Sequence, residues 1–179
     1  MKFWRRRTPI PEVPMWPTCP DAAAALRAYL AALPADPTVS RTSEMEFNGW
    51  GLDLRGGDLS GLDLAGAELG QAVATGVRMV DTDLYRAWML DTDLSGADLT
   101  GADLGKVQAC ETVLRGTVLR GARLMRADFR GADFRDADLT GADLRHGTFV
   151  DADFRGAKMH YCRTEGADFQ GALFEMASV

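Results

Sequence analysis

Residues 97–106 read Ala97-Asp98-Leu99-Thr100-Gly101-Ala102-Asp103-Leu104-Gly105-Lys106, so one five-residue pattern occurs twice in this short segment. Each unit begins with a small residue, an aspartate and a large apolar residue. In this order the first and third side chains lie on one face and the second on the other, as in a β-strand. A period of five also requires a turn in every unit, and glycine, which closes many of the units, tolerates the dihedral angles of turns.

The same pattern runs without an insertion from residue 52 to the end of the sequence. An α-helix does not fit it, because with 3.6 residues per turn a five-residue series would spiral around the whole helix surface. Short straight segments joined by corners predict instead a coil around a narrow apolar axis. The third position of the unit, which we call the centre position, is apolar in all units except that of Thr164, and in most it is large: Leu54, Leu59, Leu64, Leu69, Met79, Leu84, Met89, Leu94, Leu99, Leu104, Leu114, Leu119, Leu124, Phe129, Phe134, Leu139, Leu144, Phe149, Phe154, Met159, Phe169 and Phe174.

Units such as Ala97-Asp98-Leu99-Thr100-Gly101 and Ala132-Asp133-Phe134-Arg135-Asp136 resemble the A(D/N)LXX consensus of the pentapeptide-repeat proteins. The resemblance implies an all-β fold, a right-handed quadrilateral β-helix with four repeats per coil, which over residues 51–179 gives about six coils. The phenylalanines support four repeats per coil independently, because at the centre position they occur only as three pairs spaced by 20 residues. A 20-residue coil would stack them in two columns, one strand spacing of about 4.8 Å apart along each column: Phe129, Phe149 and Phe169 in one, and Phe134, Phe154 and Phe174 in the other.

The first 50 residues lack the repeat and are predicted to form two segments before the solenoid of residues 51–179. Residues 1–20 are rich in proline, which is typical of a linker. Residues 21–50 are predicted to contain a short α-helix with Asp21 as its N-cap and Pro34 at its end. An amphipathic stripe of Leu26, Tyr29, Leu30 and Leu33 would let this helix cover the first coil, because an open solenoid end exposes its core. Met45, Phe47 and Trp50 are predicted to form the junction.

Four repeats per coil give the solenoid four faces, which we name by their first centre residues: Leu54, Leu59, Leu64 and Leu69. The Leu69 face consists of residues 67–71 and of each five-residue unit a further twenty positions along the chain. It carries six carboxylates against Arg130, a net charge of −5, whereas the Leu64 face has a net charge of +1. The sequence therefore predicts an acidic binding face, formed by Glu68, Asp91, Glu111, Asp128, Asp151 and Asp168.

A second candidate contact site is an outward-facing apolar group in the second coil, Tyr85, Trp88 and Leu90. Trp88 stands where the consensus has aspartate or asparagine. Exposed aromatic clusters often mark contacts with other proteins. The alternative is that residues 8–20, with Met15 and Trp16, fold back and cover the group.

Composition and motifs favour a binding protein over an enzyme. A filled rod offers no concave site, and His146 and His160 do not have metal-ligand spacing with Cys110 or Cys162, so no catalytic residue, metal or cofactor is expected. A net charge of −6 disfavours non-specific binding to nucleic acid. The three widely spaced cysteines indicate a reducing compartment, and no apolar run approaches a membrane span, so a cytoplasmic location is expected.

Some proteins of the family that these repeats resemble mimic duplex DNA and protect DNA gyrase or topoisomerase IV from quinolones or natural poisons. The resemblance thus implies a protein partner of this kind and a role in antibiotic resistance. An unrelated protein partner for a general interaction scaffold is the alternative. A third hypothesis is association with a membrane surface through Phe3, Trp4 and Arg5–Arg7, which a single short basic stretch would support only weakly.

The end of the sequence also predicts self-association. Residues 172–179 continue the repeat register and contain no helix signal and no charged cap. The last coil would expose apolar side chains and unpaired backbone groups, which a second copy could bury. We therefore expect a homodimer joined end to end about a two-fold axis, with an interface formed by Phe169, Phe174, Met176 and Val179.

Overall fold

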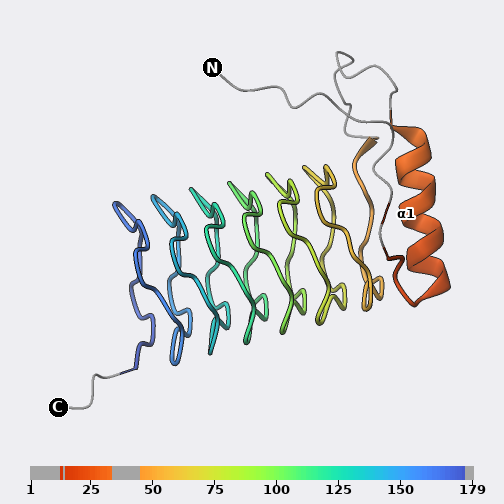
Figure 1. Cartoon of the computed structure of the whole chain (residues 1–179). Helices are drawn as coiled ribbons and strands as arrows, with labels where there is room; N and C mark the ends of the chain where they lie inside the picture. The colour runs from red at the N-terminus through yellow and green to blue at the C-terminus, as the bar shows by residue number, and fades with distance from the viewer. Residues whose placement is uncertain (1–12, 14, 34–44, 176–179) are drawn as a thin grey trace.

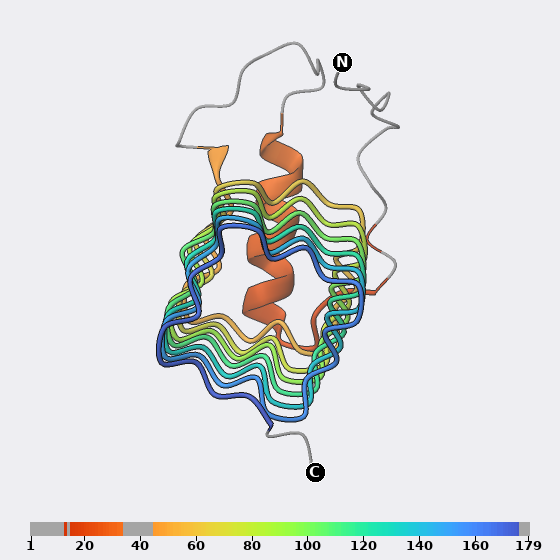
Figure 2. The same cartoon turned by 90° about the vertical axis from the view of Figure 1, so that its left-hand side faces the viewer.

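The computed structural model describes residue 13, residues 15–33 and residues 45–175. The repeats wind around one axis as a solenoid (Figure 1), and each coil has four sides (Figure 2). Successive coils are joined by parallel β-bridges between residues twenty positions apart, such as Asp83 with Asp103 and Trp88 with Gln108. Each coil therefore contains four five-residue units, as the spacing of the phenylalanines predicts. In the described part of the chain these bridges are isolated, so each side contributes one bridging residue per coil and not a longer β-strand.

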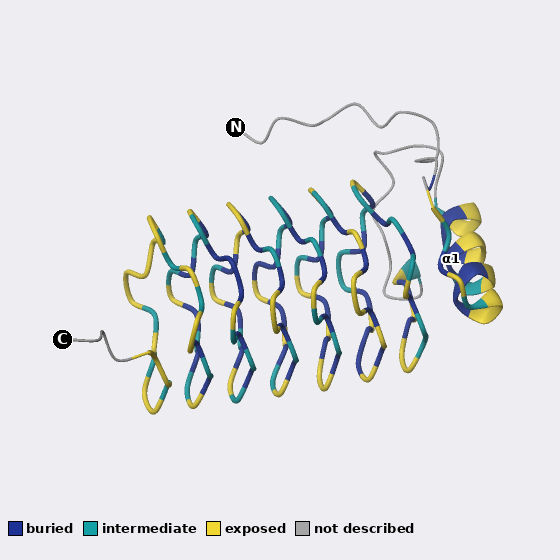
Figure 3. Cartoon of the chain, turned by 60° about the horizontal axis from the view of Figure 1, so that its bottom comes forward, coloured by how far each residue is buried: buried dark blue, intermediate teal, exposed yellow. Residues whose placement is uncertain are grey.

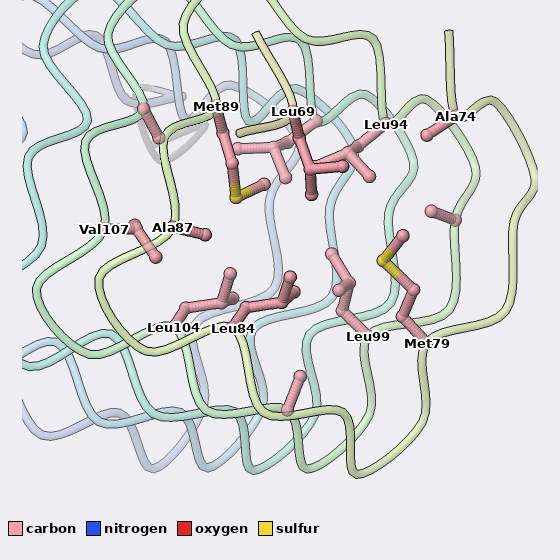
Figure 4. Close-up of a cluster of buried hydrophobic side chains, with 14 of the residues drawn as sticks. Leu69, Ala74, Met79, Leu84, Ala87, Met89, Leu94, Leu99, Leu104 and Val107 are labelled. Carbon is pink, nitrogen blue, oxygen red and sulfur yellow. The ribbon is translucent and has the colours of Figure 1, made fainter. Parts of the chain in front are cut away.

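The centre positions point into a continuous apolar core. Leu99, Leu104 and the small residue Ala102 are buried, and the close-up in Figure 4 shows the centre residues of neighbouring sides meeting across the axis. Burial follows the repeat pattern along the rod (Figure 3), with buried inner positions and exposed corners. The inside and outside assignments made from the period of five are therefore confirmed.

Each side ends in a tight turn. The N–H of Gly57, for example, donates a hydrogen bond to the carbonyl of Leu54 at 3.2 Å. The third residue of this turn, which we call the corner residue, has a positive φ in every unit from Gly51 to Gly171. Positive φ at this position is what a type II turn requires, and it explains why glycine is so frequent there.

The outward aspartate belongs to the same turn. Oδ1 of Asp98 accepts a hydrogen bond from the N–H of Thr100 at 3.1 Å, and Oδ1 of Asp103 accepts one from Gly105 at 2.9 Å. Aspartate is favoured before turns because its side chain can bond the backbone two residues on. The repeated carboxylate is thus a structural group as well as a surface charge.

Polar side chains at the small inward position are satisfied inside the core. The buried hydroxyl of Thr112 donates to the carbonyl of Met89 at 2.6 Å, and three further threonines bond the carbonyl 23 residues earlier in the same way: Thr82, Thr92 and Thr117. The thiol of Cys162 makes the equivalent contact with Leu139 at 3.0 Å, and burial raises its pKa. These donors let the core accept polar residues without leaving an unpaired group.

The predicted phenylalanine columns are present. The ring centroids of Phe134 and Phe154 are 4.7 Å apart and those of Phe149 and Phe169 are 5.2 Å apart, with nearly parallel planes. Rings of the two columns meet edge to face, as Phe129 and Phe134 do at 5.2 Å. Both arrangements are favourable for aromatic pairs.

The predicted helix is α1, Pro20–Ala32, and it lies across the N-terminal end of the solenoid (Figures 1 and 2). Leu26 and Leu30 are buried against the first coil, and the hydroxyl of Tyr29 donates to the carbonyl of Asp63. The prediction of Asp21 as N-cap is wrong, because the N-cap is Cys19 with Pro20 in the first turn. Proline suits that position since it has no N–H to leave unpaired.

Coil-to-coil pairing begins inside the segment predicted as the junction. Asn48 forms a parallel bridge with Glu68, and Phe47 is buried beside Tyr29 at 5.4 Å between ring centroids. Trp50 differs from Phe47, because 48% of its surface is exposed. The first coil thus starts with Phe47 inside and Trp50 outside.

The segment before α1 runs along the first coil. Met15 forms an antiparallel bridge with Asp58, and the ring of Trp16 lies under the guanidinium of Arg27 at 4.5 Å. The alternative in which Met15 and Trp16 cover Trp88 is therefore wrong. The described residues do not include residues 8–12 and 14, the basic stretch of Phe3, Trp4 and Arg5–Arg7, or Pro34. Within the described part of the chain, no helix is long and apolar enough to cross a membrane.

Candidate protein-binding face

The corner residues divide the solenoid into two kinds of edge. Two of the four corner columns are nearly all glycine. In the other two, the corner residues that are not glycine are Gln71, Asp91, Glu111 and Asp151 in one column, and Arg86, Lys106, Arg126 and His146 in the other. We call these the acidic corner and the basic corner. They flank a single side of the rod, the Leu69 face.

These eight residues all have positive φ, between 54° and 63°. Only three other described residues that are not glycine share this conformation: Asp81, Asp136 and Tyr161. An L-residue in the left-handed region costs on the order of 1 kcal/mol relative to glycine. Glycine would suit these corner positions better, so the side chains at the two edges of the Leu69 face lower the stability of the fold.

The middle of the Leu69 face also departs from the repeat. Its outward column is continuous through the β-bridges and consists of Asn48, Glu68, Trp88, Gln108, Asp128, Thr148 and Asp168. Asp128 and Asp168 bond the N–H two residues on, as the repeat requires. Trp88, Gln108 and Thr148 replace the aspartate of that turn. The Leu69 face thus lacks consensus residues both in its outward column and in its two corner columns.

An exposed apolar strip lies at the N-terminal end of this face. Trp88 is 56% exposed and Leu90 is 41% exposed, so both predicted residues are available for contact. Trp50 joins them, because its ring lies over Gly70, which occupies the column of Leu90 one coil earlier. Tyr85 is half-buried and precedes Arg86 on the Leu64 face, with Nζ of Lys106 at 5.4 Å from its ring.

Sequence reasoning missed Trp50 as a surface residue. The signal was present, since Trp50 precedes Leu90 by two repeats of the 20-residue register. The repeat register predicted from residue 51 onward places Trp50 in the junction before the solenoid.

The predicted carboxylates fall into two groups. The side chain of Arg130 donates three hydrogen bonds to the carboxylate of Asp128, the shortest at 2.7 Å. Burial raises the pKa of Asp128, but the hydrogen bonds and charge of Arg130 outweigh burial and lower it overall. Asp91, Glu111 and Asp151, on the acidic corner, are exposed and form no ion pair with any described residue. Glu68 and Asp168, in the outward column of the same face, are also exposed and form no ion pair with a described residue, so these five carboxylates carry the uncompensated negative charge.

The basic corner shows that the acidic face is not uniform. Sequence reasoning assigned Arg86, Lys106 and Arg126 to the Leu64 face, yet they lie on the edge that this face shares with the Leu69 face. All other arginines of the described solenoid lie within 4 Å of a carboxylate, as Arg123 and Arg145 do. The three cations of the basic corner form no such pair within residues 45–175. The Leu69 face therefore has a free positive edge and a free negative edge.

Two of the four predicted end-to-end contact residues, Phe169 and Phe174, lie in the last described coil. Phe169 is half-buried and Phe174 is 46% exposed, stacked on Phe154 at 5.3 Å. Met176 and Val179 lie outside the described residues. The last described coil is the most exposed part of the solenoid (Figure 3).

Among the residues that the structure places, no group of three or more His, Cys, Asp or Glu side chains could hold a metal ion. Cys110, next to Asp128 on the Leu69 face, is half-buried, and burial raises the pKa of its thiol. A thiol with a raised pKa is a poor nucleophile at neutral pH.

Comparison with solved structures finds other pentapeptide repeat proteins. One from the thylakoid lumen of Arabidopsis thaliana is 27% identical, with a TM-score of 0.44 and a match covering 60% of this chain and 72% of that one. QnrB1, a plasmid-mediated fluoroquinolone resistance protein, is 19% identical with a TM-score of 0.43, and the match covers 70% of this chain and 67% of that one. HetL, involved in heterocyst differentiation in Nostoc, is 21% identical with a TM-score of 0.25, covering 72% and 87%. No curated protein matches the chain.

The family comparison is more extensive. The family model described as pentapeptide repeats matches in eight copies, over residues 53–89, 78–116, 92–131, 102–141 and 132–175. These ranges cover the solenoid from residue 53 to residue 175 without a gap, which is well over half of the chain. Proteins of this kind fold as right-handed quadrilateral β-helices, in agreement with the four-sided coils described above. The chain belongs to the pentapeptide-repeat family.

Proposed function

We propose that this protein is a non-enzymatic binding rod and that the Leu69 face is its contact surface for another protein. The observation that carries the proposal is the position of the strained corner residues. Eight of the eleven non-glycine residues with positive φ in the described part of the chain lie on the two edges of this face. Strain that the fold does not need is typical of functional sites.

The composition of the face supports the same conclusion. Protein interfaces are enriched in tryptophan, tyrosine and arginine, and the exposed strip of Trp50, Trp88 and Leu90 lies between two charged edges. An apolar centre supplies affinity through burial. A rim of free charges supplies orientation and a faster encounter with a partner of complementary charge.

DNA gyrase is the specific partner that the family resemblance suggests, with topoisomerase IV as the related alternative. The free carboxylates Asp91, Glu111 and Asp151 would meet the positive surface that normally binds DNA. Duplex DNA carries one charge per roughly 1.7 Å of axis, or about 17 over a 30 Å rod. The Leu69 face carries a net charge of −5 over a similar length and has a basic edge. Charge density therefore favours a general protein-binding face over close DNA mimicry.

The decisive experiment is a gyrase supercoiling assay with and without a quinolone. The test variant is Asp91→Gly/Glu111→Gly/Asp151→Gly, which removes the acidic corner while placing glycine where the backbone prefers it. The matched control is Asp81→Gly/Asp136→Gly, which removes two corner carboxylates from other edges.

If gyrase is the partner, we expect the wild type and the control to protect supercoiling and the test variant to lose protection. Equal protection by the test variant would remove the acidic corner from the mechanism. No effect of the wild type on gyrase or topoisomerase IV would leave the Leu69 face as the contact site for an unrelated protein.

Two further expectations belong to this proposal. The half-buried free thiols of Cys19, Cys110 and Cys162 suit a reducing compartment, which supports a cytoplasmic location. The exposed rings of the last coil offer a second surface for self-association, because an end-to-end homodimer would bury Phe174 against its copy; this contact is the alternative to association through the Leu69 face. Sedimentation of Phe174→Glu against the wild type tests that contact, because a carboxylate would oppose burial of the end.

A further inference from the structure

The two corners of the Leu69 face carry opposed side chains in three coils, whereas Arg126 lies level with Gly131. Arg86 and Asp91 flank one side of the same coil, Lys106 and Glu111 flank the side of the next, and His146 and Asp151 repeat the arrangement two coils further on. We propose that two copies of this chain pair side by side through their Leu69 faces, about a two-fold axis parallel to the rod. The inference rests on the Leu69 face being a contact surface, and it names a partner for that face.

The symmetry follows from the positions of the charges. A two-fold axis parallel to the rod keeps the coils of the two copies level and exchanges the edges of the face. The basic corner of each copy then lies opposite the acidic corner of the other, so that Arg86 meets Asp91 of the second copy and Lys106 meets Glu111 of the second copy. A two-fold axis across the rod would place like charges together, which is unfavourable. Only the parallel arrangement is self-complementary.

The middle of the face satisfies the same symmetry. Trp88 lies nearer the basic corner and Leu90 nearer the acidic corner, so each tryptophan would cover the leucine of the second copy. Asp128 and Arg130 hold corresponding positions two coils further along and would meet in the same crossed manner. The exposed apolar strip would be buried at one end of the contact, while charge pairs on both edges set its register.

The size of the Leu69 face determines the expected affinity of the dimer. The outward column from Asn48 to Asp168 spans six coil spacings, or roughly 30 Å at about 4.8 Å each. A single flat side of this length lies at the small end of specific interfaces. We therefore expect a dimer that forms at micromolar to submillimolar concentration and weakens as salt screens the exposed charges.

The test uses two charge-reversed forms of the full chain. The acidic-edged variant, Arg86→Asp/Lys106→Glu, has two negative edges, and the basic-edged variant, Asp91→Lys/Glu111→Lys, has two positive edges. Both should fold, because aspartate, glutamate and lysine already occupy corners with positive φ at Asp81, Glu111 and Lys106. Circular dichroism and melting temperature verify this. Asp81→Lys/Asp136→Lys reverses two corner charges away from the face and serves as the control.

Sedimentation velocity over a concentration series gives the result. We expect the wild type, the control and Phe174→Glu to dimerise with equal affinity. Each charge-reversed variant alone should self-associate at least tenfold more weakly. A one-to-one mixture of the two charge-reversed variants should form a dimer again. A wild type that stays monomeric up to several hundred micromolar overturns the proposal. So does a mixture that fails to associate, or a wild-type dimer that Phe174→Glu abolishes, since that result assigns self-association to the end of the rod. The experiment contains no other protein, so its failure leaves the assay with gyrase as a separate question.

Discussion

The indole ring of Trp50 lies directly over the backbone of Gly70, and a Cβ atom built on Gly70 would be 2.3 Å from Cζ3 of Trp50. Gly70 does not have a positive φ, so it is glycine because of this ring and not because of its backbone conformation. The contact holds Trp50 against the Leu69 face beside Leu90. A single methyl group therefore decides whether the first coil contributes an aromatic ring to this surface.

We expect Gly70→Ala to displace the Trp50 ring and to lower the free energy of unfolding by about 1 kcal/mol. In the Trp50→Ala background the same change should be neutral or slightly stabilising, because alanine reduces the conformational entropy of the unfolded chain. Chemical denaturation of the wild type, both single variants and the double variant gives the coupling between the two sites. An equal loss of unfolding free energy in both backgrounds would contradict a contact between Gly70 and the Trp50 ring.

Replacing a charged corner residue by glycine should stabilise the rod. Arg126 has a φ of 56°, is exposed and forms no ion pair with a described residue. Arg126→Gly should raise the free energy of unfolding by about 0.5–1 kcal/mol, the strain removed less the added chain entropy of glycine. Arg123→Gly, at an outward position that is paired with Asp103 at 3.4 Å, should lower it. Equal effects in the two variants would show that the corner conformation carries no cost.

The outward aspartate should matter through its oxygen and not through its charge. Asn in place of Asp98 keeps the acceptor for the N–H of Thr100, so Asp98→Asn should change stability little. Asp98→Ala removes the acceptor and should cost about 1 kcal/mol. Leu99→Asp places a carboxylate in the dry core and should unfold the coil. The melting temperatures of the three variants test this order. A melting temperature of Asp98→Asn as low as that of Asp98→Ala would contradict it.

Acid should destabilise the rod in a defined window. The hydrogen bonds of Arg155 are the main cause that lowers the pKa of Asp153 to about 2, and those of Thr140 and Arg120 lower the pKa of Asp138 to about 2. Free aspartate titrates near 3.9. A carboxyl whose pKa is lowered by folding stabilises the fold above the unfolded pKa, and this stabilisation is lost as pH falls from about 4 towards 2. The urea midpoint of unfolding should therefore decline as pH falls over this range. The midpoint of Asp153→Asn should decline less than that of the wild type. Equal declines in the two proteins would exclude a role for Asp153.

Much of the fold could be read from the five-residue period, and the exceptions have physical causes. The inward series, the 20-residue register and the two phenylalanine columns depend on side-chain alternation and turn geometry, which are local properties of the chain. The helix start was misplaced because aspartate is the better N-cap in isolation, whereas Pro20 fits the first turn and Cys19 precedes it. The course of Met15 along Asp58 could not be foreseen, since one antiparallel bridge leaves no pattern in a sequence.

The sequence by itself determined the repeating unit, the coil of four units and the column to which each residue belongs, because every unit repeats the same local turn. Only the tertiary structure decided which columns border the same surface and which charges form ion pairs. The corners, which a face-by-face count of charges assigns to one side, are edges that two sides share, so Arg86 and Asp91 border the same surface. Only in the folded rod do ion pairs between neighbouring coils, such as Arg123 with Asp103, cancel some charges and leave those of Glu111 and Lys106 free. Pairing and exposure depend on distances between coils, and those distances arise when the coils stack.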